Sequence, residues 1–143
     1  MTFLLDTNVL SEGFRRFPDH DVIEWLDDVP EESTFISAVT VGEVRKGIEK
    51  LPLGRRRSNL EAWLTDGLVP RFEGRILAID TDVADLWGRT VAACQADGRP
   101  VDPIDAQIGA TALWYGLTLV TRNVEDFVPM GVELFNPWLS EAE

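Results

Sequence analysis

Short apolar runs and helical stripes alternate along the 143 residues of the chain. Continuous apolar runs between polar segments are typical of strands that are buried on both faces of a sheet. Stretches with apolar residues every three or four positions are typical of helices packed on one side. Because strands and helices alternate, we predict an α/β fold: one domain over residues 1–143, with a parallel sheet covered by helices. The predicted strands are residues 3–5, 34–37, 75–79, 117–120 and 132–135, and the predicted helices are residues 41–50, 56–68, 82–96 and 104–115.

The composition is that of a globular chain, with 45% hydrophobic and 27% charged residues. Cys94 is the only cysteine, so no disulfide can form within the chain and the fold does not depend on an oxidising compartment. The first residues lack the basic stretch of a signal peptide, and no segment approaches the ~18 apolar residues of a membrane span. We therefore expect a cytoplasmic protein without a membrane segment.

The chain contains a single histidine, His20, which limits the possible catalytic mechanisms. Ribonuclease mechanisms and zinc sites that need two or more histidines are excluded. A Ser-His-Asp triad would have to use His20, which lies in the acidic and predictably exposed segment 18–21. Such a base must be held and oriented by its surroundings, so this segment disfavours a triad.

The formal net charge of −12 is unevenly distributed. Residues 1–43 contain 10 acidic and 2 basic residues, and residues 76–143 contain 11 acidic and 3 basic residues. Residues 44–75 instead contain 8 basic and 4 acidic residues. The total argues against a nucleic-acid partner, but the basic segment is either a solvated helical face or a docking strip for a polyanion. Its basic residues are Arg45, Lys46, Lys50, Arg55, Arg56, Arg57, Arg71 and Arg75.

Four polar segments follow a predicted strand or begin a predicted helix: residues 6–8, 40–43, 102–105 and 121–126. Each has a structural interpretation as a helix cap. Residues 40–43 match the capping box Thr-x-x-Glu, and Asp102 followed by a proline is a natural N-cap. Asp6 and the Asn-x-x-Asp spacing of residues 123–126 allow the same interpretation.

Taken together, the four segments indicate more than caps. The carboxyl ends of parallel strands meet at one edge of a sheet, so we expect Asp6, Glu43, Asp105 and Asn123 to converge there. Three unpaired carboxylates would repel one another strongly, and a hard divalent cation such as Mg²⁺ or Mn²⁺ relieves that repulsion. A bound cation also activates water, which removes the need for a catalytic histidine.

At these residues the sequence resembles the PIN-domain ribonucleases of the VapC toxin family, and in particular their FitB-like branch. The resemblance rests on residues 4–12, 36–47, 105–112 and 119–127, with the ending Phe-Asn-Pro-Trp at 135–138, and it covers about residues 2–138. It implies a five-stranded parallel sheet flanked by helices, Mg²⁺- or Mn²⁺-dependent cleavage of RNA, a homodimer and a VapB-type antitoxin.

The resemblance also assigns roles by position. Asp6, Glu43 and Asp105 match the family's acidic residues: Asp6 and Asp105 are the expected direct metal ligands, and Glu43 joins them or positions the attacking water. Asn123 stands where the family often has Asp; an amide can either ligate a metal or hydrogen-bond its water but adds no charge, which argues against a tightly held second metal. Asp126 either contributes through water or caps its helix, and we favour the cap. Thr7 and Thr121 are expected to orient the carboxylates through their hydroxyls.

From these observations we predict a metal-dependent endoribonuclease toxin that hydrolyses a structured RNA, tRNA or rRNA. The predicted substrate-binding residues are Arg45, Lys46, Lys50, Arg55, Arg56 and Arg57. One alternative is a PIN-like module that binds proteins without catalysis. A receiver-like signalling domain is disfavoured because it needs a lysine at the end of a late strand, and the two lysines of the chain are Lys46 and Lys50.

Overall fold

A five-stranded parallel sheet forms the centre of the protein, in the order β3-β2-β1-β4-β5. The structure is a computed structural model that describes residues 1–139, so the last four residues of the domain predicted over 1–143 lie outside the described residues. The strands are β1 Phe3–Leu5, β2 Thr34–Ser37, β3 Ile76–Leu77, β4 Thr118–Val120 and β5 Leu134–Phe135. The predicted strand positions and the parallel α/β class are confirmed, although β3 and β5 are shorter than predicted.

The register of the strands brings their carboxyl ends to one edge. Phe3 of β1 is paired with Thr34 of β2 on one side and with Thr118 of β4 on the other. The three central strands therefore run level with one another, and the residues that follow them leave the sheet at the same edge. Asp6 and Thr121 are the first residues after β1 and β4, as the sequence pattern predicted.

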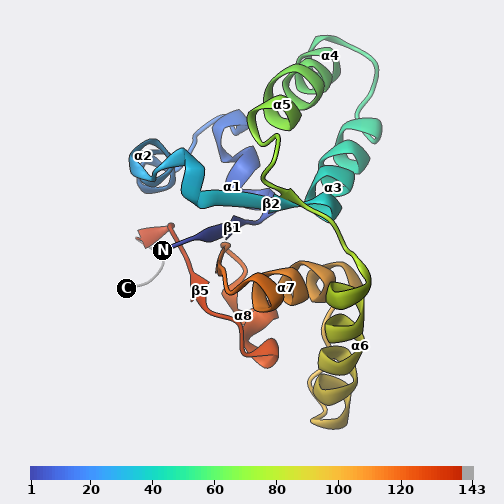
Figure 1. Cartoon of the computed structure of the whole chain (residues 1–143). Helices are drawn as coiled ribbons and strands as arrows, with labels where there is room; N and C mark the ends of the chain where they lie inside the picture. Colours follow the sequence, from blue (N-terminus) through green and yellow to red (C-terminus); the bar gives the residue numbers. More distant parts are fainter. Residues whose placement is uncertain (140–143) are drawn as a thin grey trace.

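Helices cover both faces of the sheet, and Figure 1 shows α1 to α5 on one side and α6 to α8 on the other. Alternate residues of β1 supply the two cores, since Leu5 packs with Val9, Ile48 and Leu68, whereas Leu4 packs among residues of α6 and α7. The helices are α1 Thr7–Ser11, α2 His20–Asp28, α3 Ala38–Glu49, α4 Arg55–Ala62, α5 Val69–Arg71, α6 Thr81–Ala96, α7 Pro103–Tyr115 and α8 Val124–Phe127. Short 3₁₀ turns occupy Glu12–Phe14, Glu31–Ser33 and Val128–Met130.

The predicted start of α3 was wrong by three residues. The helix begins at Ala38 because the Ser37 side chain accepts a hydrogen bond from the Val39 amide at 3.1 Å and caps it. Thr40 and Glu43 therefore lie inside the helix, and the capping box predicted for residues 40–43 is not formed. The Thr40 hydroxyl is buried and has no hydrogen-bond partner among the described residues.

The single helix predicted over residues 56–68 is three segments. After α4 the chain widens into π-helical turns at Trp63–Leu68 and ends in α5. The Val69 amide bonds to the Leu64 carbonyl, five residues back. Pro70 follows directly, and a proline has no N–H for a regular α-helical hydrogen bond, so a wider turn accommodates it.

Among the helices outside the predicted ranges, α1 and α8 follow the caps allowed at Asp6 and Asn123, whereas α2 lies where neither a helix nor a cap was predicted. α2 begins after Asp19, whose carboxylate accepts hydrogen bonds from the amides of Asp21 and Val22 at 3.0 and 3.2 Å. Its buried residue, Val22, anchors it to the sheet. None of the helices within residues 1–139 has the length and apolar character that a membrane span requires.

Candidate active site

Asp6 stands at the carboxyl end of β1 with two fixed hydrogen bonds. It is 5% exposed, caps α1 by accepting from the Thr7 amide at 2.8 Å, and accepts from the Thr121 hydroxyl at 2.8 Å. Burial raises the pKa of Asp6, and both hydrogen bonds oppose that shift because they favour the ionised form. Asp6 therefore caps α1, as its position allowed. It is also buried, which a helix cap does not need to be.

Two hydroxyls join the separate elements of the site, as expected from their positions. Thr7 of α1 donates to the Glu43 carboxylate of α3 at 3.2 Å. Thr121, after β4, donates to Asp6 and accepts from the Asn123 amide at 3.0 Å and from the Asn8 side chain at 3.4 Å. Because these bonds cross from α1 to α3 and from β1 to β4, they hold the ends of three strands in register.

Asp105 lies in the first turn of α7. The N-cap predicted for Asp102 is confirmed, since its carboxylate accepts from the amides of Ile104 and Asp105 at 3.0 and 3.2 Å. Burial and the neighbouring negative charges raise the pKa of Asp105 to about 7. A carboxylate at a helix N-terminus is ordinarily stabilised in its charged form, so this shift shows how strongly its surroundings oppose the charge.

Five carboxylates from four parts of the fold, the end of β1 and the helices α3, α7 and α8, act on one another. The charges that raise the pKa of Asp105, after burial, are those of Asp6, Asp102, Asp126 and Glu43. Burial raises the pKa of Glu43 as well, with further contributions from Asp6 and Asp102. Asp126 adds to the raised pKa of Asp6. We refer to Asp6, Glu43, Asp102, Asp105 and Asp126 as the carboxylate cluster.

The cluster contains two acids that the sequence analysis placed only as caps or as doubtful members. Asp102 caps α7 and also contributes its charge to the cluster. Asp126 does not cap α8, because its N-cap residue is Asn123, and Asn123 makes no side-chain capping bond. The spacing of three residues between Asp102 and Asp105 was a usable signal, since it places both in one helical turn.

The cluster has the donor chemistry of a divalent cation site. Its ligand atoms are oxygens, their charges repel, and no lysine or arginine within residues 1–139 forms an ion pair with Asp6, Asp105 or Glu43. Over the same residues, no three acidic, histidine or cysteine side chains converge closely enough to ligate one ion as they stand. The donor chemistry therefore fits a hard cation, and ligation requires the carboxylates to come closer together than they lie here.

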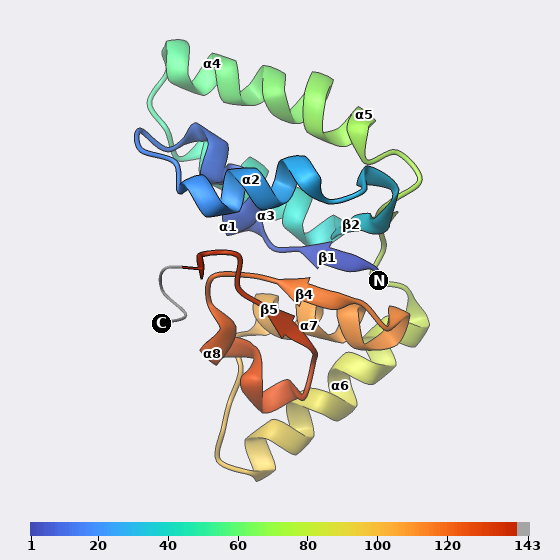
Figure 2. The ribbon, with the colours of Figure 1, turned by 90° about the vertical axis from the view of Figure 1, so that its left-hand side faces the viewer.

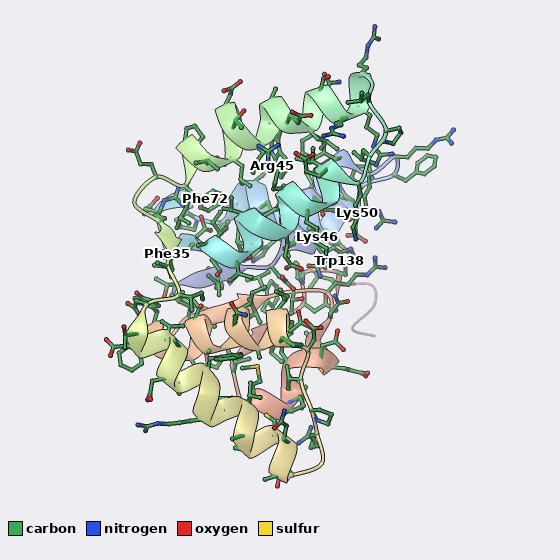
Figure 3. The ribbon with its side chains drawn as sticks, turned by 90° about the vertical axis from the view of Figure 1, so that its right-hand side faces the viewer. Phe35, Arg45, Lys46, Lys50, Phe72 and Trp138 are labelled. Carbon is green, nitrogen blue, oxygen red and sulfur yellow. The ribbon has the colours of Figure 1, made fainter. Side chains whose placement is uncertain are left out.

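The predicted basic residues fall into two groups. Lys46 and Lys50 lie three and seven positions after Glu43, so they share its face of α3, and Lys46 lowers the pKa of Glu43. Figure 3 shows Lys46 and Lys50 following one another along α3, whereas Arg45 lies toward α4 and α5. The Arg57 side chain is only 18% exposed. It forms ion pairs with Glu49 and Glu61 and donates to the Leu51 carbonyl, so it holds α4 against α3. Arg55 and Arg56 are exposed.

Comparisons with known proteins agree with this architecture. The PIN domain family model matches residues 3–128. The chain is 38% identical to toxin FitB of Neisseria gonorrhoeae over 135 residues, which is 94% of this chain and 97% of FitB. It is 34% identical to VapC ribonuclease Y4jK of Sinorhizobium fredii over 94% of this chain and 96% of that protein. The crystal structure of FitAcB from Neisseria gonorrhoeae superposes with a TM-score of 0.92 and 37% identity, covering 96% of this chain and 99% of that one.

Proposed function

The chain belongs to the PIN-domain family, and from that premise we propose that it is a divalent-metal-dependent endoribonuclease, the toxin of a toxin–antitoxin pair. The observation that carries the proposal is the carboxylate cluster at the carboxyl edge of the sheet. Burial and the charges of four neighbouring acids raise the pKa of Asp105 to about 7, so the folded protein disfavours the charged form of this carboxyl. Perturbed groups of this kind gather where chemistry is done.

In the proposed mechanism, the carboxylates of Asp6 and Asp105 would hold a divalent cation, and a cation bound there would supply an activated water and offset phosphate charge. Mg²⁺ and Mn²⁺ both suit an oxygen ligand set, and we propose that the cofactor is Mg²⁺ or Mn²⁺. Thr121 keeps the Asp6 carboxylate ionised and oriented by donating its proton at 2.8 Å.

Glu43 receives the proton of the attacking water. Its raised pKa suits a general base, and its Oε1 is already held by the Thr7 hydroxyl at 3.2 Å, which leaves Oε2 for the water. Asn123 supplies a neutral amide at the rim, so it can bond to substrate or water without adding to the repulsion. Lys46 and Lys50, on the same face of α3 as Glu43, bind the phosphates next to the cleaved bond.

The names of the relatives direct the biological part of the proposal. One relative is called a toxin and another a ribonuclease, so we propose a structured RNA, tRNA or rRNA, as the substrate. We further propose that the protein works in the cytoplasm, forms a homodimer and is held inactive by a cognate VapB-type antitoxin. The FitAcB structure, whose fold this chain shares, comes from the same Neisseria species as toxin FitB.

Asp6→Asn tests the catalytic assignment. Asparagine is as good an N-cap as aspartate, so the cap on Thr7 survives while one ligand charge is lost. We expect RNA cleavage in Mg²⁺ or Mn²⁺ to fall at least 100-fold in a gel assay with total tRNA and ribosomal RNA. The variant should still fold, with a melting temperature lowered by the loss of the hydrogen bond from Thr121, which melting curves check. The matched control is Asp82→Asn on α6, which removes an exposed charge that contributes to none of the raised pKa values of the cluster.

Full cleavage by the Asp6→Asn variant, or cleavage that survives removal of the metal by EDTA, would contradict the proposal. Absence of cleavage by the wild-type protein, together with unchanged divalent-cation binding in Asp105→Ala, would favour the non-catalytic interaction module instead.

A further inference from the structure

A groove of about 900 Å³ separates the loop after α1 from the first turns of α4. Four arginines line it, Arg15 and Arg16 from the loop and Arg55 and Arg56 from α4, together with Phe14 and Phe17. No acidic side chain of the described residues lines it. In a chain of net charge −12, a groove with four positive charges and no negative one is a local reversal of sign.

Most of this charge is unpaired. Within residues 1–139, Arg16, Arg55 and Arg56 lie within ion-pair distance of no carboxylate, whereas Arg15 is paired with buried Glu12 at 3.1 Å. α4 also begins at Arg55 without a side-chain cap, so the positive end of its helix dipole adds to the same potential. The groove is therefore complementary to an anion.

The aromatic residues in the groove are of two kinds. The Phe14 ring packs edge-on against Trp63, with the ring centroids 4.6 Å apart, and is anchored by that contact. Phe17 is 79% exposed, and the Arg16 guanidinium lies 5.4 Å from its ring centroid. An exposed aromatic ring beside unpaired arginines is the arrangement that stacks an unpaired base and binds its phosphates.

The loop that carries Phe17 is held in place. Buried Glu12 accepts hydrogen bonds from the Arg15 guanidinium at 3.1 Å and from the Asp19 amide at 3.0 Å, so it joins the two ends of the loop. Figure 2 shows this loop beside the start of α4, at the end of the molecule where β1 leads into α1. Lys46 and Lys50 extend along α3 toward the same end (Figure 3).

We propose that this groove binds an unpaired segment of the RNA substrate, with one base stacked on Phe17 and its phosphates bound by Arg16, Arg55 and Arg56. The proposal rests on the proposed ribonuclease function, and it adds the class of substrate: an RNA with a single-stranded loop or end next to the cleaved bond. A continuous duplex cannot present an unstacked base to Phe17, so it binds less well.

The test compares a labelled single-stranded RNA of about 12 nucleotides with the same RNA annealed to its complement, by fluorescence anisotropy in EDTA over a range of salt concentrations. Phe17→Ala should weaken binding of the single strand roughly tenfold, the size of one lost stacked base, without changing the salt dependence. The double variant Arg55→Gln/Arg56→Gln should lower the slope of log affinity against log salt by roughly 0.7 for each phosphate that is no longer neutralised.

The controls are matched in charge and exposure. Arg89→Gln, on α6 across the sheet, removes one positive charge, and Arg89→Gln/Arg99→Gln removes two. Both should leave RNA affinity within about twofold of the wild type. All the substituted side chains except that of Arg89 lack ion pairs within residues 1–139, so the variants should fold, which melting curves check.

Three results would overturn the groove proposal: affinities equal to the wild type, equal losses for single strand and duplex with Phe17→Ala, or unchanged RNA binding combined with lost binding of the proposed VapB-type antitoxin. The last result would assign the groove to a protein partner. Cleavage by the wild-type protein in Mn²⁺, measured beside these titrations, keeps the two proposals apart, because it tests the ribonuclease function whether or not the groove binds RNA.

Discussion

At the scale of single residues, the Thr121 hydroxyl controls the state of Asp6. It accepts hydrogen bonds from the Asn123 amide and the Asn8 side chain, so its own proton points to the Asp6 Oδ2 at 2.8 Å. Asp6 Oδ2 must therefore accept this hydrogen bond, and it accepts best when it carries no proton of its own. The arrangement therefore favours the ionised carboxylate at a buried position where desolvation opposes it.

We predict that Thr121→Val lowers the free energy of unfolding by about 1.5–3 kcal/mol, the worth of a hydrogen bond to a charged group. The substitution keeps the shape of the side chain but leaves buried Asp6 without its donor, so the pKa of Asp6 rises further and divalent-cation affinity near neutral pH falls. Urea denaturation and calorimetric metal titration measure the two effects. Thr121→Ser keeps the hydroxyl and should retain most of both, and equal behaviour of the valine and serine variants would contradict this role.

At the scale of elements, the short connection between α7 and β4 depends on the backbone conformation of one glycine. Gly116 ends α7 in the left-handed region, with φ of 66° and ψ of 36°, and the Leu117 amide bonds back to Ala112 at 2.9 Å. Two residues after Gly116 the chain is already in β4, beside β1. This tight turn places Thr121 level with Asp6, so the backbone conformation of one residue supports the site at the far end of the strand.

We predict that Gly116→Ala lowers the free energy of unfolding by about 1–2 kcal/mol. Nothing lies within 4 Å of the added Cβ, so the effect comes from the positive φ alone. Gly88→Ala, in the exposed middle of α6, also meets nothing within 4 Å and should instead stabilise the protein by about 1 kcal/mol because alanine is the better helix former. Chemical denaturation of the two variants checks the opposite signs; a loss of stability in both would point to crowding.

At the scale of the whole molecule, folding buries the acids of the carboxylate cluster and brings their charges together, which disfavours their ionised forms. The acids come from the ends of β1 and from α3, α7 and α8, and they are far apart in an unfolded chain. Burial of Asp105, together with the convergence of the other acids, raises its pKa from 3.8 to about 7. Between these values the native protein holds a proton that the unfolded chain has released, so the free energy of unfolding falls as the pH rises through this window.

We predict that the metal-free protein melts at a lower temperature near pH 8 than near pH 5, and that Asp105→Asn reduces this difference. The asparagine has no charge to ionise, so the variant should be more stable than the wild type near pH 8 and nearly equal to it near pH 5. Scanning calorimetry in EDTA measures both. Asp82→Asn, which removes an exposed charge from α6, should keep the wild-type pH dependence, and an Asp105→Asn curve parallel to the wild type would contradict the coupling.

The sequence by itself determined the strands, their parallel arrangement and the acids at their carboxyl edge. These features follow from local rules: buried strands are apolar, caps are polar, and parallel strands end together. Asp6, Glu43 and Asp105 could therefore be identified from the order of residues along the chain. The exact start of α3 was less accessible, because Ser37 and Thr40 are both possible caps and only packing selects between them.

Only the tertiary structure decided which distant charges meet. Arg15 and Arg16 stand in the acidic first segment of the sequence, yet the loop held by Glu12 brings them against Arg55 and Arg56. Arg57, next in sequence, turns the other way and binds Glu49 and Glu61. Proximity between residues about 40 positions apart depends on how helices pack, which no local pattern encodes. The net charge of −12 describes the whole chain. The fold gathers five acids into one cluster and, separately, four arginines around one groove.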